Sequence, residues 1–296
     1  MSQTHSESWL SLCAGLPVIA GSTPKAGRGL YALVDLDYAA TVFTAKPLVC
    51  TPASSSGTLR SCLYCLRPLP GTRAQQYCSE RCSQKAAEVL PSSLTSSWTR
   101  FTDSASRRGF VYPLLAAQIA LGVENGVFTQ RVLEPLCYAR GAVTDPPLAW
   151  KEEHRLLLEA LRESGHDVAS WMTVDWYASV LARLHLNSFR VDIPRVDMPL
   201  SLDALAQQAQ NGSGTAVYML PSLLNHSCEP NIDAVWRDGD ATLTLAARRD
   251  IAAGEELNIT YIDAGLPATE RRQLLLNGYG FVCMCPACVD ELGDDA

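Results

Sequence analysis

Apolar and β-branched residues alternate with polar ones in two short segments near the start of the chain. Residues 27–36 read Gly-Arg-Gly-Leu-Tyr-Ala-Leu-Val-Asp-Leu, which predicts a glycine turn that leads into a strand. Residues 41–50 read Thr-Val-Phe-Thr-Ala-Lys-Pro-Leu-Val-Cys and predict a second strand, which Pro52 and a serine- and glycine-containing linker terminate. The first elements that the pattern predicts are therefore strands.

The middle of the chain changes to helical spacing. Between Val111 and Arg190, apolar positions recur every three or four residues, and Asp145-Pro146-Pro147 separates two of the segments. A shorter helix precedes this region and ends before Pro91. The predicted helices cover residues 79–90, 113–121, 152–163 and 174–186.

Strand-like alternation returns in the last third of the chain. Strands are predicted over residues 215–220, 232–237, 241–247 and 257–261. Asp238-Gly239 between the second and third of these is a hairpin signal. Residues 200–210 form either a short helix or an irregular insert. A last helix is predicted over 269–277, with Thr269 or its neighbour as N-cap and Gly278 as the end. The pattern predicts a β domain split by a cysteine-rich module and an all-helical insertion.

Composition and charge narrow the class of protein. A chain of 296 residues that is 47% hydrophobic can bury one large core or two smaller ones. Its net charge of −7 and pI near 5.3 argue against direct nucleic-acid binding, and suit either a basic partner or an ordinary solvated surface. No apolar run reaches about 18 residues and no signal peptide is recognisable, so we expect an intracellular protein of the nucleus or cytoplasm, without a membrane span.

Eight of the eleven cysteines fall into two clusters, which in a reducing compartment favour metal over disulfides. The first cluster consists of two closely spaced pairs, on either side of a turn that contains Pro68, Pro70 and Gly71. Pairs of this spacing can close a tetrahedron around one Zn²⁺. Its predicted ligands are Cys62, Cys65, Cys78 and Cys82.

The second cluster places three thiols within six residues, in Cys283-Met-Cys285-Pro-Ala-Cys288. Cys228 is the natural fourth ligand, so a zinc ion here would join Asn225-His226 to the end of the chain. Buried free thiols or disulfides are the alternative for both clusters. Three isolated cysteines are interpreted as small core residues: Cys13, Cys50 and Cys137.

Five short motifs, in order, resemble those of one known family. They are Gly27-Arg-Gly-Leu-Tyr31, Asn187-Ser-Phe189, Asn225-His-Ser-Cys-Glu-Pro-Asn231, Gly254-Glu-Glu-Leu-Asn-Ile-Thr-Tyr261 and Tyr279-Gly-Phe-Val-Cys-Met-Cys-Pro-Ala-Cys288. Each motif alone is weak, but the chain carries all five. It resembles the SET-domain protein lysine methyltransferases, and within them the SET-and-MYND group.

The resemblance implies an α+β protein with a β-rich SET fold, in which a C-terminal segment threads under a loop. A MYND-like zinc finger and an all-helical insertion split this fold, and a post-SET zinc site closes it. The implied parts are the N-terminal SET part at 15–52, the finger at 58–90, the insertion at 91–185, the C-terminal SET part at 186–265 and the post-SET segment at 266–296.

The resemblance also implies a reaction and its participants. S-adenosylmethionine is the expected cofactor, and two Zn²⁺ ions are expected. The expected partner is a protein with an exposed lysine, such as a histone tail, and we expect a monomer. Methyl transfer to a neutral amine needs in-line alignment and exclusion of water. Tyr261 is the predicted catalytic residue, because its hydroxyl can align the amine and favour loss of its proton.

The resemblance assigns eight residues to cofactor binding: Arg28, Gly29, Leu30, Asn187, Asn225, His226, Tyr261 and Phe281. Arg28 and Gly29 are expected to act through the main chain, since glycine permits close approach. For His226, either the main chain or the ring is the contact, and a purely structural ring is equally open. Phe281 packs on the adenine or lines the lysine channel, with core burial as the alternative.

Two departures from the family set limits on this interpretation. A complete MYND module has seven cysteines and one histidine for two zinc ions, whereas the first cluster here has four cysteines. We therefore expect one zinc ion and a truncated finger, and the binding of proline-rich peptides known of MYND modules is not carried over to it. No long helical repeat domain follows the second cluster in this sequence, so a more open substrate cleft is expected.

Two other functions remain open at this stage. The chain could be a catalytically silent, zinc-stabilised adaptor that binds partners through its finger and helical insertion. It could also be a SET enzyme that acts on another amine. Tyr261, Asn225 and Phe281 favour an active lysine methyltransferase, because a silent adaptor has no chemical need for all three.

Overall fold

The structure is a computed structural model that describes residues 9–23, 27–53, 60–69, 75–107, 111–138, 141–193 and 212–292. The chain divides into two compact units, which are described separately. The strand unit comprises Met1–Lys46, Met219–Val235 and Leu243–Ala296, and the helical unit comprises Pro47–Tyr218 and Trp236–Thr242. No described helix is both long and apolar enough to cross a membrane.

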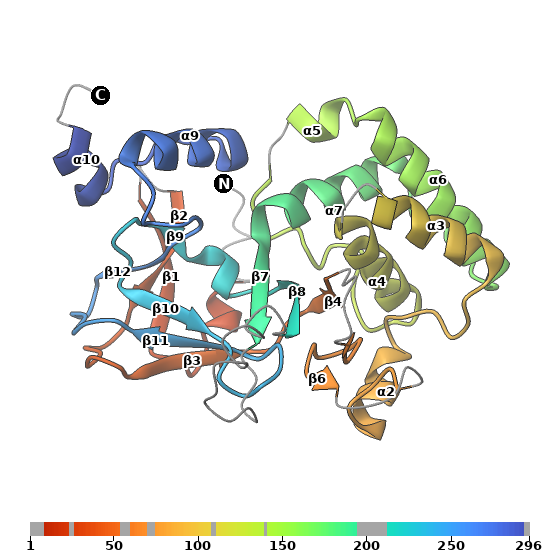
Figure 1. Cartoon of the computed structure of the whole chain (residues 1–296), viewed down its shortest axis with the longest axis horizontal. Coiled ribbons are helices and arrows are strands. Elements are labelled where there is room, and N and C mark those ends of the chain that lie inside the picture. Colours follow the sequence, from red (N-terminus) through yellow and green to blue (C-terminus); the bar gives the residue numbers. More distant parts are fainter. Residues whose placement is uncertain are drawn as a thin grey trace, which may run out of the picture. The chain divides into compact units, whose positions relative to one another are not determined.

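Two sheets form the strand unit (Figure 1). The first has the order β1-β2-β12-β9, with bounds Val18–Thr23, Gly27–Ala32, Glu256–Ile259 and Asn225–His226. The second has the order β10-β11-β3, with bounds Ile232–Val235, Leu243–Ala247 and Thr41–Ala45. Every residue of β11 is buried, which fits a central strand covered on both faces.

The pairing of β12 with β9 is parallel, with Asn258 opposite Asn225 and Ile259 opposite His226. β12 also pairs with β2, where Leu257 lies opposite Leu30. Strands that lie far apart in sequence therefore meet at β12. This register brings the Asn225-His226 motif next to the segment that ends in Tyr261.

Among the described residues of the strand unit, two helices and a short 3-10 turn lie around its C-terminal strands. The turn η2 (Pro221–Leu223) leads into β9, and the helices α9 (Ala268–Tyr279) and α10 (Pro286–Leu292) follow β12. Gly280 ends α9 in the left-handed region, with φ +77°, where glycine carries no side-chain penalty. The chain then turns directly into the second cysteine cluster.

The helical unit is built on a small sheet of order β4-β8-β7, with bounds Val49–Pro52, Gly212–Val217 and Ser188–Ile193. Its finger contains β5 (Arg60–Ser61), β6 (Pro68–Leu69) and α2 (Glu80–Ala86). The insertion contains α3 (Ser96–Arg107), α4 (Tyr112–Glu124), α5 (Gly141–Thr144), α6 (Leu148–Glu163) and α7 (Val174–Asn187), and Figure 1 shows its long helices packed together.

Local chemistry explains where these helices begin and how they pack. The Thr173 hydroxyl accepts a hydrogen bond from the Trp176 N–H (3.1 Å) and caps α7. Helix α3 packs against α6, where the Trp98 indole donates to the Ser164 hydroxyl (2.7 Å). Trp98 is 2% exposed, so its only polar side-chain atom is buried with a partner.

Several predicted elements are confirmed and others need correction. The helix over 174–186 and the hairpin at Asp238-Gly239 are confirmed. The single strand predicted over 41–50 is wrong: Pro47 follows the end of β3, and β4 belongs to a different sheet. Helix α3 was not predicted. Residues 200–210 lie outside the described residues.

The prediction for the last helix is wrong at both ends. Pro267 occupies the N-cap position, for which Thr269 or its neighbour was predicted. The first N–H of the helix is satisfied instead by the Glu291 carboxylate (2.8 Å). Gly278 does not stop the helix, because Gly280 provides the left-handed residue two positions later.

Candidate active site

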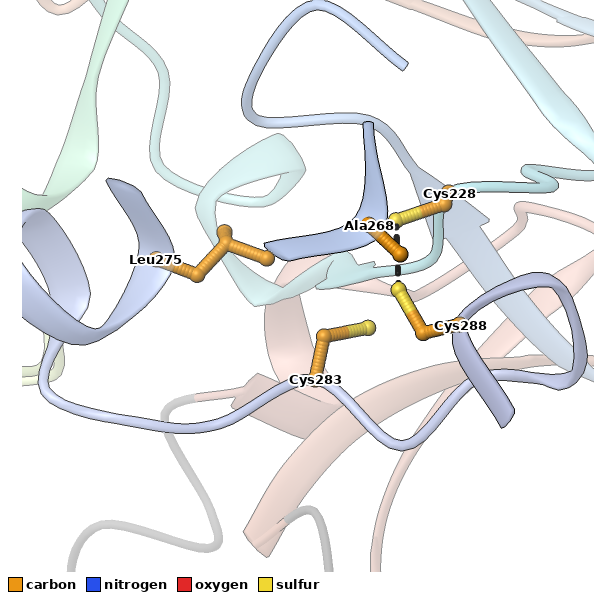
Figure 2. Close-up of a cluster of buried hydrophobic side chains, with 5 residues drawn as sticks. All are labelled: Cys228, Ala268, Leu275, Cys283 and Cys288. Atoms are coloured by element: carbon orange, nitrogen blue, oxygen red, sulfur yellow. Dashed lines mark hydrogen bonds between the residues drawn. The ribbon is translucent and has the colours of Figure 1, made fainter. Parts of the chain in front are cut away.

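The second cysteine cluster gathers four thiols from three places in the strand unit. Cys228 follows β9, Cys283 and Cys285 follow α9, and Cys288 lies in α10. All four Sγ atoms lie within 4.8 Å of one another, and those of Cys228 and Cys288 are 3.6 Å apart. In Figure 2, the thiols of Cys228 and Cys288 face each other, with Cys283 beside them. Ligands at 2.3 Å in a tetrahedron would be about 3.8 Å apart, so the cluster fits Zn²⁺.

Two buried arginines from α9 surround this cluster. The guanidinium of Arg271, which is 5% exposed, donates to Cys288 Sγ (3.5 Å) and to the Glu291 carboxylate (3.1 Å). Arg272 donates from Nε to the Cys283 carbonyl (3.0 Å). Positive charge beside sulfur stabilises thiolates, which are the form that binds metal.

The first cysteine cluster lies in the finger of the helical unit. Its four Sγ atoms also lie within 4.8 Å of one another, and Cys78 Sγ is 3.5 Å from both Cys65 Sγ and Cys82 Sγ. Ser79 caps α2 by accepting from the Cys82 N–H, which orients the second pair. Leu66 takes φ +61° directly after the first pair, a backbone strain that the tight turn imposes. This cluster too fits one Zn²⁺.

One thiol in each cluster is acidified by its neighbours. A hydrogen bond with the Cys65 thiol lowers the pKa of Cys62 to about 4. At Cys285, burial opposes ionisation, but hydrogen bonds from the main-chain N–H groups of Cys228 and Cys288 lower the pKa to about 7. These thiols need little or no proton loss at neutral pH before they bind a metal.

The Asn225 amide lies at the start of β9 and is fixed by two acceptors. Its Nδ2 donates to the Arg28 carbonyl (2.9 Å) and to Glu256 Oε1 (2.7 Å). Both partners can only accept, so the amide orientation is determined by its surroundings. The other amide atom, Oδ1, is the acceptor that Asn225 can offer to a ligand.

Gly29 lies against this pair and leaves no room for a side chain. A Cβ atom at this position would lie 2.7 Å from Glu256 Oε1 and 2.9 Å from Asn225 Nδ2. The polar groups of Asn225 and Glu256 thus approach the main chain of β2 closely, which only glycine permits. Gly29, Asn225 and Glu256 together form a cradle with one negative charge.

Hydrogen bonds hold both the side chain and the main chain of Tyr261. Its hydroxyl donates to the Leu224 carbonyl (2.5 Å), and its main-chain N–H donates to His226 Nδ1 (3.0 Å). Its ring centroid is 4.8 Å from that of Tyr279 and 5.3 Å from that of His226. The side chain is half-buried, so the phenol is oriented without being sealed in the core.

The His226 ring lies between Tyr261 and the second cluster. Its Nε2 is 3.4 Å from Cys228 Sγ, and its centroid is 6.1 Å from that of Phe281. Burial, together with the charge of Arg271, lowers the pKa of His226 to about 4. The ring is therefore neutral at pH 7.

The remaining predicted cofactor residues have different surroundings. Leu30 is fully buried in β2, so it has only its main chain to offer. The Arg28 guanidinium lies 5.6 Å from the Trp9 ring centroid, and its carbonyl accepts from Asn225. Asn187 belongs to the helical unit, where its amide donates to two main-chain carbonyls (2.8 and 2.7 Å) at the end of α7. Their cofactor roles stay predictions.

A model of the SET domain family matches residues 27–262. The chain belongs to the SET-domain family. Histone-lysine N-methyltransferase ATXR4 of Arabidopsis thaliana is 33% identical over 286 residues, which cover 92% of this chain and 86% of that protein. A SET and MYND domain-containing protein of Dictyostelium discoideum is 26% identical over 272 residues, 85% of this chain and 77% of that protein. The SET domain of LSMT, crystallised with lysine and AdoHcy, aligns with a TM-score of 0.42 and 16% identity over 96% of this chain and 58% of that one.

These matches confirm the family that the five motifs predicted. The predicted enzyme class is confirmed as well, since relatives across this SET family are named histone-lysine or protein-lysine N-methyltransferases. The mixed α and β fold and both four-cysteine clusters agree with the prediction. The threading of the C-terminal segment and the five domain boundaries stay predictions.

Three residues of this SET domain site were missed by sequence reasoning. Glu256 lies inside a quoted motif, yet its contact with Asn225 depends on the register of β12 with β2 and β9. Arg271 is one of two adjacent arginines on α9, and nothing in the sequence says that it faces a thiol. Leu224 contributes only a carbonyl, which has no sequence signature.

Proposed function

We propose that this SET-domain protein is an S-adenosylmethionine-dependent protein-lysine N-methyltransferase. The observation that carries the proposal is that β9 connects two features, because Asn225 belongs to the cradle and the adjacent His226 contacts Tyr261. The cradle of Gly29, Asn225 and Glu256 lies at β2, β9 and β12, and the doubly held Tyr261 follows β12. A place for a cationic ligand and an oriented phenol therefore occur on one small sheet.

The cradle suits a small zwitterionic cofactor with an extra positive charge. Asn225 Oδ1 would accept from its ammonium group, and the Glu256 carboxylate would place negative charge beside it. Gly29 would allow the main chain to approach closely, as the space around it requires. When bound, S-adenosylmethionine supplies an electrophilic methyl group on a positively charged sulfur.

Tyr261 would orient the acceptor amine. The phenol donates its hydrogen bond to the Leu224 carbonyl, and a phenol oxygen can also accept from an amine N–H. An amine held in this way can align its lone pair with the methyl group, which is the main requirement of an in-line transfer. The rings of Tyr279 and Phe281 are half-buried and would favour the alkyl part of a lysine.

The remaining parts of the proposal concern partners and metal. We propose Zn²⁺ in both clusters, a protein substrate with an exposed lysine, such as a histone tail, and residence in the nucleus or cytoplasm. The net charge of −7 suits a basic substrate segment. Support for a protein substrate comes from the names of the relatives, which are histone-lysine and protein-lysine methyltransferases.

Calorimetric titration with S-adenosylmethionine tests the cofactor, with metal content assayed on the same samples. Asn225→Ala should weaken binding by about tenfold or more, in line with the loss of charge-assisted hydrogen bonds. Asn277→Ala is the matched control, because Asn277 is exposed on α9 of the same unit and should bind as the wild type does.

Transfer itself is tested with lysine-containing peptides, and Tyr261→Phe should lower kcat with little change in cofactor affinity. Folded, zinc-loaded wild type that binds no cofactor would contradict the proposal and favour a silent, zinc-stabilised adaptor. Cofactor binding followed by methylation of a different amine would retain the cofactor site but replace the substrate class.

A further inference from the structure

The imidazole of His226 connects the main chain of Tyr261 to a sulfur of the second cysteine cluster. Its Nδ1 is 3.0 Å from the Tyr261 main-chain nitrogen, and its Nε2 is 3.4 Å from Cys228 Sγ. These two contacts lie at opposite ends of one rigid ring. All three residues belong to the strand unit.

The chemistry of the partners determines which ring nitrogen carries the proton. A main-chain N–H can only donate, so Nδ1 of His226 must be the bare, accepting nitrogen. The neutral ring then carries its proton on Nε2. This N–H can donate to the sulfur of Cys228 when that sulfur is a thiolate. Both nitrogens are thereby occupied within the protein. The ring has no polar atom left for a cofactor.

One short segment, residues 224–228, contacts both the side chain and the main chain of Tyr261. The Leu224 carbonyl accepts from the phenol, and the His226 ring, two residues later, accepts from the main chain. Cys228 follows after two more residues and holds the far side of the ring. The orientation of Tyr261 therefore depends on a segment whose last member is a predicted metal ligand.

We propose that His226 is a positioning residue that fixes Tyr261 to the second zinc centre, and that its ring does not bind the cofactor. This inference rests on the proposed function, because it gives Tyr261 its catalytic part. A metal ion held by the four cysteines would keep Cys228 deprotonated and in place as the acceptor for Nε2–H. When the metal is lost, the ring loses this anchor, and the Tyr261 main chain loses a fixed acceptor.

Two conservative variants separate the two halves of the connection. His226→Asn retains an acceptor at the δ position for the Tyr261 N–H but has no atom at the position of Nε2. His226→Gln retains a donor at the ε position for Cys228 but has carbon where Nδ1 was. His185→Gln is the matched control, because His185 lies in α7 of the helical unit.

The first measurement reads the hydrogen bonds directly. The full chain is loaded with ¹¹³Cd²⁺, a spectroscopic substitute for zinc, and labelled with ¹⁵N in its tyrosines and histidines. The wild type should show a coupling between ¹¹³Cd and the Nε2 proton of His226, and a strongly hydrogen-bonded Tyr261 amide proton. His226→Asn should lose only the coupling. His226→Gln should shift only the Tyr261 amide proton.

The second measurement separates turnover from affinity in the zinc-loaded protein. His226→Gln should lower kcat by about tenfold, because the Tyr261 main chain loses its acceptor and the phenol is less well placed, while KM for S-adenosylmethionine stays close to the wild-type value. His226→Asn should release zinc from the second cluster to a chelator about tenfold faster. His185→Gln should change neither quantity.

Three results would overturn the inference. One is a weakened cofactor affinity with unchanged kcat in both variants, which would place the ring against the cofactor. Another is a protonated Nδ1 in the wild type. The third is an unchanged Tyr261 amide in His226→Gln. If the wild type transfers no methyl group at all, the proposed function fails, whereas the cadmium coupling and the amide shift still decide whether the connection exists.

Discussion

The two cysteine clusters offer the same four thiols to a metal but differ in how much of the protein they join. The first closes between residues 62 and 82, inside one finger. The second joins Cys228 to residues 283–288, across the intervening strands β10, β11 and β12 and helix α9. A metal therefore ties a local loop in one case and distant segments in the other.

The groups around the two cysteine clusters also differ. Around the first cluster, the Cys65 carbonyl accepts from the Ala241 N–H (2.7 Å). The side chain of Leu66 in the finger packs over Gly214 of β8. Around the second cluster are His226, which contacts Tyr261, and Arg271, which donates to a thiol. Identical ligand chemistry thus supports a packing contact in one unit and an oriented phenol in the other.

The largest effect is expected when the second cluster loses a ligand. Cys283→Ser should remove one zinc ion per chain and weaken S-adenosylmethionine binding by about tenfold to a hundredfold, because the segments around His226 and Phe281 lose their common tie. Metal analysis and calorimetry on the same sample measure both. If the variant lacks one zinc ion but binds the cofactor as the wild type does, the two clusters do not differ in their effect on cofactor binding, which would contradict this expectation.

The matching change in the first cluster should have a local result. Cys78→Ser should also remove one zinc ion, and hydrogen exchange should then accelerate in the finger, between residues 60 and 90. Cofactor affinity should stay close to that of the wild type, since the cradle lies in the strand unit. An affinity loss as large as that of Cys283→Ser would contradict this expectation.

A smaller effect is expected from crowding the contact between the finger and its sheet. At Gly214, a Cβ would lie 2.5 Å from the Thr51 carbonyl oxygen and 2.7 Å from Leu66 Cδ1. Gly214→Ala should lower the free energy of unfolding by about 1–3 kcal/mol, as overpacking does. Denaturant unfolding measures this.

Gly278 supplies the matched control for that substitution. It lies inside α9, and apart from its chain neighbours and the backbone of its own helix, no described atom lies within 4 Å of a Cβ built there. Gly278→Ala should raise the free energy of unfolding by about 0.5–1 kcal/mol, because alanine is the better helix former. Equal destabilisation by the two alanines would mean that the clash at Leu66 does not explain the first effect.

The smallest effect is expected at a contact made by a carboxylate and not by thiolates, between helices α3 and α6. The stability lost there at low pH is a reference for acid effects that involve neither cysteine cluster. Glu163, at the end of α6, accepts from the Ser97 N–H (3.0 Å) and the Ser96 hydroxyl (3.2 Å) at the start of α3. Hydrogen bonds from Ser97 hold the pKa of Glu163 below its usual value. A lowered folded-state pKa means that this stabilisation is present above the unfolded-state pKa of about 4.3 and is lost as the pH falls through the folded-state value.

Glu163→Gln tests this sign, because glutamine keeps an acceptor but does not titrate. The difference in Tm between wild type and variant should be largest at neutral pH and should shrink below about pH 4. Thermal unfolding from pH 3 to pH 7 measures the difference. A gap that is constant over this range would mean that ionisation of Glu163 does not stabilise the α3–α6 contact.

The sequence predicts the metal-binding thiols better than it predicts the groups that hold Tyr261. Both thiol sets were predictable, because cysteines separated by one to three residues in a reducing compartment most often bind metal. Tyr261 was predictable because it ends a motif. The groups that hold it were not: the Leu224 carbonyl is common to every residue type, and the contact of Glu256 with Asn225 arises from strand register.

The errors in the fold have a similar physical origin. A continuous apolar pattern over 41–50 cannot reveal that the two halves pair with different strands, since β3 joins β11 and β4 joins β8. Gly278 and Gly280 both lie near the end of α9, and the sequence prediction placed the end at Gly278. Only the backbone conformation distinguishes Gly278, which stays helical, from Gly280, which does not.

The strand pairing also determines in what order the molecule can assemble as it is synthesised. The four thiols of the finger have all been made once the chain reaches Cys82, so the finger can acquire its metal early in translation, and β4 finds its partner β8 once the chain has been made through Val217. β3 must wait for β11, and β2 for β12. The thiol of Cys288 leaves the ribosome after all of these. A chain interrupted in its final segment would thus carry a complete finger and complete sheets but would lack thiols of the second cluster, and the His226 ring that contacts Tyr261 would lack its anchor.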